Sequence, residues 1–160
     1  MRKPATKNKG VSRRKRRSWS RVSKKRKNMG FQIEHHNSLT DFQKLGYIAA
    51  EIRISRDEIA KIVEEDPSVV NGALNRGSVP AHIANAQEIS DKLYQVRMLF
   101  SSLLRLCQYS DTEANRLLSD TTEFKQCLKP PPWYPRSLRE YITSGKIGAV
   151  HNALLWLRTY

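Results

Sequence analysis

The segment SRDEIAKIVEEDPSVVNGALNRG, residues 55–77, contains the clearest helix boundaries in the chain. Ser55 stands three residues before Glu58, which is the spacing of a capping box at a helix N-terminus. Asp66-Pro67 suits an N-cap followed by the first helical position, and Gly77 is typical of a helix C-terminus. The segment therefore predicts two short helices joined by a tight acidic turn, Glu64-Glu65-Asp66, which we interpret as solvated rather than as an acid–base pair.

Two helices around a short turn are the arrangement of a helix-turn-helix, whose second helix enters the DNA major groove. Ala60 is the small residue needed where the helices cross, and Val70 and Leu74 would anchor the second helix in the core. Asn can pair bidentately with adenine, and Arg with guanine. The outward residues of the second helix are therefore the predicted DNA contacts: Ser68, Val69, Asn71, Gly72, Asn75 and Arg76.

Helical periodicity continues on both sides of this segment. A helix is predicted from about Thr40 to Glu51, and a long one after Val79-Pro80, with apolar residues at steps of three and four from Ile83 to Cys107. This long helix is either a central core helix or a helix shared in a homodimer. No β-hairpin signal is present, so the predicted fold is all-α. Ser110 to Glu113 and Ser137 to Glu140 are two more capping boxes, and each predicts the start of a later helix. The helix that begins at Ser137 is expected to end at Gly145, and a last helix follows it.

The positive charge is concentrated at the N-terminus. Residues 1–30 hold fourteen of the 29 Lys and Arg residues and no Asp or Glu, so the other fifteen basic residues balance all fifteen acidic ones. A segment of this composition cannot bury enough apolar surface to fold, which predicts a disordered arm over residues 1–38. Phosphate backbones are its natural partner because each neutralised phosphate releases a counterion. The contacts expected from its two densest clusters are Arg13, Arg14, Lys15, Arg16, Arg17, Lys24, Lys25, Arg26 and Lys27.

Other readings of the arm are a nuclear address, a solubilising tail, or a ligand for acidic proteins or membranes. The chain lacks the apolar runs of a secretory signal or a membrane span, and Cys107 and Cys127 suit a reducing compartment. Its histidines have no ligand partners at metal-binding spacing, and it has neither a nucleophile elbow nor a phosphate-binding glycine loop. We therefore expect a cytoplasmic, nucleoid-associated protein that binds rather than catalyses and uses no cofactor or metal.

The sequence resembles two related groups of regulators. The two helices predicted within residues 55–77 resemble the Xre-type helix-turn-helix of repressors. The residues that carry this resemblance are Ser55, Glu58, Ile59, Ala60, Ile62, Val63, Val70, Leu74 and Gly77. From about Leu39 to Leu157, the chain resembles the Xre-MbcA-ParS antitoxins, through Leu117-Leu118-Ser119, Ser137-Leu138, Gly145, Val150 and Leu154. Within the helix-turn-helix it departs from the pattern at Glu64, where a turn Gly is usual, at Ala73, where a large residue is common, and at Pro67, at the helix start. Elsewhere, Lys129 to Pro135 replace Asn-Pro and Gly-Gly elements, and the basic arm is atypical.

The resemblance implies a helix-turn-helix domain over residues 39–79, and a long helix with a small toxin-binding domain over residues 80–160. It also implies double-stranded DNA and a cognate toxin as partners, the toxin often being one that consumes NAD. The segment from Ser137 to Tyr160 is the predicted partner surface, because Leu155 and Trp156 lie outside the apolar stripe predicted for the last helix and Trp and Tyr anchor interfaces. The expected partner contacts are Trp133, Tyr134, Tyr141, His151, Leu155, Trp156 and Tyr160.

Three functions are compatible with these patterns. The first is a dimeric DNA-binding antitoxin that regulates transcription in a type II toxin–antitoxin system. The second is an RNA- or ribosome-associated structural protein whose arm threads between phosphates, and the third is an antitoxin that no longer reads DNA. Sequence preference separates them, because a regulator favours its site over random duplex by a factor on the order of 10³ or more.

Overall fold

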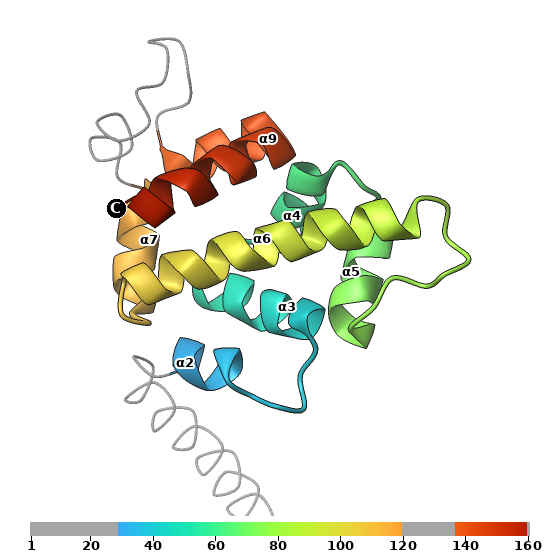
Figure 1. The fold of residues 1–160 in the computed structure, drawn as a ribbon, viewed down its shortest axis with the longest axis horizontal. Helices are drawn as coiled ribbons and strands as arrows, with labels where there is room; N and C mark the ends of the chain where they lie inside the picture. Colours follow the sequence, from blue (N-terminus) through green and yellow to red (C-terminus); the bar gives the residue numbers. More distant parts are fainter. Residues whose placement is uncertain (1–28, 120–136, 160) are drawn as a thin grey trace, which may run out of the picture.

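The computed structural model describes residues 29–119 and 137–159, and every regular element within these ranges is an α-helix. The all-α prediction is therefore confirmed for the described part of the chain. The helices are α2 (Met29–Glu34), α3 (Asp41–Glu51), α4 (Arg56–Val63), α5 (Pro67–Arg76), α6 (Ala86–Leu106), α7 (Asp111–Ser119) and α9 (Leu138–Thr159) (Figure 1).

Helix α6 runs through the middle of the molecule, between α9 and α3 (Figure 1). Its buried side chains recur at the predicted steps of three and four and include Leu93, Val96 and Phe100, which is fully buried. The helix begins at Ala86, later than predicted, because residues after Pro80 form consecutive turns instead: the Ile83 amide donates to the Pro80 carbonyl, and the Ala86 amide to that of Ile83.

Hydrogen bonds from nearby side chains cap the helices at the starts that the sequence predicts. Ser55 and Glu58 form the reciprocal box, with distances of 3.1 Å from the Glu58 amide to Ser55 Oγ and 3.2 Å from the Ser55 amide to Glu58 Oε1. Thr40 and Gln43 form another at the start of α3. Ser110 and Ser137 accept from the amides three residues on, at 3.3 and 3.2 Å, at the starts of α7 and α9. The predicted break after Gly145 is present as a non-helical residue inside α9, Lys146 (φ 57°, ψ −140°).

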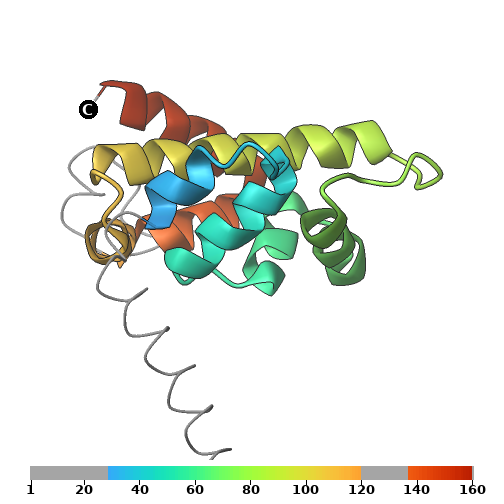
Figure 2. The same ribbon diagram turned by 90° about the horizontal axis from the view of Figure 1, so that it is seen from below.

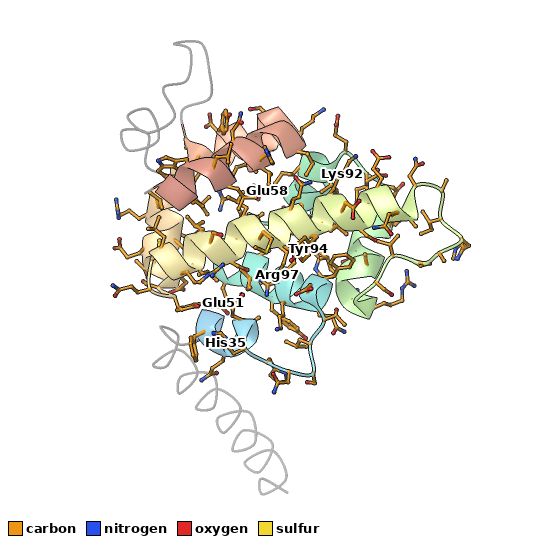
Figure 3. The ribbon with its side chains drawn as sticks, viewed as in Figure 1. His35, Glu51, Glu58, Lys92, Tyr94 and Arg97 are labelled. Carbon is orange, nitrogen blue, oxygen red and sulfur yellow. The ribbon has the colours of Figure 1, made fainter. Side chains whose placement is uncertain are left out.

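The prediction of a structureless segment up to residue 38 is wrong for its last part, because Met29–Glu34 form α2. The Glu34 carboxylate accepts two hydrogen bonds from the Arg97 guanidinium of α6, at 2.9 and 3.1 Å, and one from Ser101, at 3.1 Å. Arg97 is labelled in Figure 3. Gly30 lies so close to α6 that a Cβ there would stand 3.2 Å from Leu104 Cδ1. A buried ion pair and close packing therefore fix this short helix.

The boundary predicted between Val79 and Pro80 does not divide the core. Buried residues from α3 to α5 and from α6 to α9 belong to one continuous hydrophobic cluster. Arg139 of α9 also donates to the carbonyl oxygens of Ile52 and Arg53, at 3.3 and 2.8 Å, and lies 3.5 Å from the Glu58 carboxylate. The first turn of α9 is thus bound directly to the end of α3 and the start of α4.

Candidate nucleic-acid interface

Helices α4 and α5 are joined by Glu64–Asp66 and lie at the end of the molecule away from α7 (Figures 1 and 2). Glu64 makes the turn possible with a left-handed backbone (φ 57°, ψ 45°), and the Asp66 carboxylate caps α5 by accepting from the Ser68 amide at 2.7 Å. Ala60, Val70 and Leu74 are buried, as predicted, so the inner face of α5 belongs to the core. Its outer face is left to solvent.

Four of the six predicted contacts on α5 are exposed: Ser68, Asn71, Asn75 and Arg76. The other two are not freely presented. Val69 is half-buried and packs against the core. Gly72 is half-buried and covered by the Arg76 side chain, since a Cβ at Gly72 would stand 2.5 Å from Arg76 Nη2. The outer face therefore consists of long polar side chains.

Arg56, the first residue of α4, is an exposed residue on this face that the sequence reasoning missed. Its Nη1 donates to Oδ1 of both Asn71 and Asn75, the second at 2.6 Å. The guanidinium packs over Gly46 of α3, where a Cβ would be in ordinary contact with Nη2 at 3.5 Å. Two signals were available: Asn71 and Asn75 are one helical turn apart, and a positive charge in the first turn of a helix opposes the helix dipole.

The C-terminal end of α5 is held against α3. Gln43 donates from Nε2 to the Asn75 carbonyl at 3.2 Å. Gly77 closes the helix with φ 87°, and a Cβ there would come within 2.3 Å of Thr40 Oγ1, so only glycine fits both the backbone angle and the space. These contacts fix the orientation of the polar face relative to the rest of the bundle.

Two of the three acidic groups of the turn, Glu64 and Glu65, lie beside basic side chains. Lys146 of α9 binds Glu64 at 2.5 Å, and Lys92 of α6, which is labelled in Figure 3, lies 3.7 Å from Glu65. The hydrogen bond and the charge of Lys146 lower the pKa of Glu64, despite a small opposing effect of desolvation. The turn therefore presents less negative charge to an approaching ligand than its sequence suggests.

Asp66 is the third acidic group. Hydrogen bonds from the side chain and the backbone of Ser68 lower its pKa. A carboxyl with a lowered pKa in the folded state stabilises the fold at pH above its usual pKa, and this contribution is lost as the pH falls through the folded pKa. The cap at the start of α5 is accordingly fully formed at neutral pH and weakens in acid.

The predicted partner contacts are not gathered on one surface. His151 and Leu155 are exposed, but Tyr141 and Trp156 are buried, so the prediction of an outward Trp156 is wrong. Trp156 follows Ala149 by seven residues and Ala153 by three, which places it on the same buried stripe of α9. Three further partner residues and the nine arm residues lie outside the described part of the chain: Trp133, Tyr134, Tyr160, Arg13, Arg14, Lys15, Arg16, Arg17, Lys24, Lys25, Arg26 and Lys27.

The described ranges were also compared with the patterns of a metal site, a membrane span and a ligand pocket. No group of three His, Cys, Asp or Glu side chains in residues 29–119 and 137–159 is placed to hold a metal ion. No helix of the described chain has both the length and the apolar character of a membrane span. An open hollow of about 710 Å³ lies between α4, the turn and α9, lined by the paired charges of Glu64 and Lys146.

Comparison of the chain with protein-family models, with curated proteins and with solved structures gave no match.

Proposed function

We propose that the chain binds double-stranded DNA in a sequence-dependent way, with α4, the turn and α5 acting as a helix-turn-helix. The observation that carries this proposal is the outer face of α5, where Asn71, Asn75 and Arg76 are exposed beside Arg56. These are the side-chain types that reach base edges in the major groove. The inner face of the same helix is anchored in the core, so the polar side chains are held by a rigid element.

The size and place of α5 suit the groove. Its ten residues span about 15 Å, and the major groove is about 12 Å wide and admits one helix. The helix lies at an edge of the bundle, where the bulk of the molecule does not obstruct a duplex (Figure 2). Lys146 and Lys92 offset two of the three charges of the acidic turn, which reduces the electrostatic repulsion between this face and DNA.

The basic N-terminal segment would supply a second kind of contact. Its fourteen Lys and Arg residues favour phosphates of any sequence, whereas residues 31–160 have no net charge to attract DNA. Phosphate contacts position a protein on the duplex, and base contacts specify the site. We therefore assign affinity mainly to the arm and specificity to α5.

The resemblance to antitoxins extends this proposal to a transcriptional regulator that also neutralises a cognate toxin. Of the contacts expected for the toxin, His151 and Leu155 of α9 are exposed, Leu155 by 49%. They would form the described part of that surface. DNA binding has the stronger support, because its residues lie together on one helix face.

The test is the affinity of the full chain for a duplex selected from a random library, compared with a scrambled duplex and with RNA. We expect a preference on the order of 10³ or more for the selected site. Asn71→Ala or Arg76→Ala should weaken binding to that site by about 1–3 kcal/mol and to scrambled DNA much less. Arg105→Ala, which removes an exposed charge in the last turn of α6, is the matched control. Equal affinity for every duplex and for RNA would favour the structural RNA-binding alternative.

A further inference from the structure

We infer that Arg56 fixes which bases α5 can recognise, by occupying the acceptor atoms of Asn71 and Asn75 and leaving a face of hydrogen-bond donors. This inference rests on the proposed DNA binding. It predicts that the face, which we call the donor face (Arg56, Asn71, Asn75 and Arg76), contacts the N7 and O6 acceptors of guanine. Free asparagines in the same places would read adenine instead.

The contact geometry uses both amide oxygens at once. Nη1 of Arg56 carries two N–H groups, and it donates to Oδ1 of Asn71 and to Oδ1 of Asn75. The two asparagines are four residues apart on α5, so their side chains lie on one face of the helix and a single guanidinium nitrogen can bridge them.

The orientation of both amides follows from chemistry. A guanidinium offers only donors, so an amide beside it must present its oxygen, because the rotated amide would place Nδ2 donors against Nη1 donors. Oδ1 of each asparagine therefore faces Arg56, and Nδ2 is the group left for a ligand.

Adenine recognition by Asn needs both ends of the amide, since Oδ1 accepts from N6 and Nδ2 donates to N7. Each Oδ1 keeps a second lone pair, but an adenine N6 donor directed at it would meet the positive guanidinium as well. Guanine presents only acceptors on this edge, so Nδ2 of the asparagines and the guanidinium of Arg76 suit it.

The donor face has a boundary at the N-terminal end of α5. The Ser68 hydroxyl donates to the Asp66 carboxylate at 2.6 Å, so its oxygen can only accept from a ligand. The face consequently runs from an acceptor at Ser68 to donors from Asn71 to Arg76. A guanine-rich edge beside Asn71 and Asn75, with a donor-bearing base towards Ser68, is the complementary pattern.

The position of Arg56 is better explained by its contact with the two asparagines than by a contribution to the stability of α4. It is exposed and occupies the first turn of α4, where the helix dipole disfavours a positive charge. Arg56→Met, which keeps the long stem and removes the donors, should therefore fold normally. Arg53→Met is the matched control. Arg53 is exposed and lines, together with Arg56, a second hollow, between α3 and α4, but it bonds neither asparagine in the described structure.

The experiment selects duplexes from a random library with the wild-type chain, Arg56→Met and Arg53→Met. We expect guanine at the α5-contacted positions for wild type and Arg53→Met, and a shift towards adenine of about tenfold or more for Arg56→Met. Adding Asn71→Ala or Asn75→Ala to Arg56→Met should abolish the adenine preference at one position each. Adenine selected by the wild type, or an unchanged motif in Arg56→Met, would overturn the inference while leaving DNA binding intact. A library from which no motif emerges with any variant would overturn the proposed function and this inference together.

A measurement without DNA tests the contact itself. The side-chain NH₂ resonances of Asn71 and Asn75 in the free protein should shift in Arg56→Met and stay in place in Arg53→Met, because Arg56 bonds their amides and Arg53, among the described contacts, does not. Unshifted resonances in Arg56→Met would contradict the inference whatever the selection gives. An unchanged thermal transition would show that the variant is folded.

Discussion

Arg97 and Glu34 form an ion pair whose members are 63 residues apart in sequence and join α6 to α2. Both side chains are largely buried, with exposed fractions of 6% and 15%. Removing Glu34 leaves the buried Arg97 guanidinium beside the more distant and more exposed Asp41, 3.8 Å from Nε, so Glu34→Ala should lower the free energy of unfolding by about 3 kcal/mol. Glu88→Ala, which removes an exposed carboxylate paired with the half-buried Lys92, should cost less than about 1 kcal/mol. Urea denaturation measures both, and equal losses would contradict this account.

The sequence could predict residue-scale features that depend on near neighbours. The caps at Ser55 and Asp66 involve groups two or three residues apart, so their chemistry is visible in the sequence. Arg56 lies 15 and 19 residues from the asparagines that it bonds. Contacts at such separations depend on how helices pack, and neither capping rules nor periodicity contains that information.

Among the elements, α9 is the helix whose buried face differs from the predicted apolar stripe. Trp156 belongs to the buried stripe of the helix, whereas Leu155 points to solvent with 49% exposure. Trp156→Ala should therefore lower the free energy of unfolding by about 3–5 kcal/mol, because it empties a large volume of the core. Leu155→Ala should change it by less than about 0.5 kcal/mol. A stable Trp156→Ala variant that loses only partner binding would restore the original surface interpretation.

Helix α2 is the element that the sequence did not reveal. A helix of six residues is not stable in isolation, and its formation here depends on α3 and α6. Phe31 contributes through ring contacts with His35 and Tyr109, 4.4 and 5.2 Å between centroids. Longer helices such as α3 and α6 carry enough apolar positions for the pattern itself to predict them.

At the scale of the whole molecule, one hydrophobic cluster includes residues on both sides of the predicted domain boundary, and the charge is divided unevenly along the chain. Deleting residues 1–28 removes all fourteen N-terminal basic residues and keeps α2. The slope of log K against log salt should fall, by at most about 12 if every charge met a phosphate and by less if fewer do. The truncated chain should keep its preference for the selected duplex. An unchanged slope would show that the segment does not contact nucleic acid.

The central claim is that the outer face of α5 contacts the duplex, and amide NMR spectra of the full chain with and without the selected DNA test it most directly. The account predicts that the largest shifts fall on the first turn of α4 and on residues 68–76, including the side-chain amides of Asn71 and Asn75. Residues of α7, at the opposite end of the molecule, should shift little (Figure 1). Shifts confined to the N-terminal basic segment, with α5 unchanged, would contradict the claim.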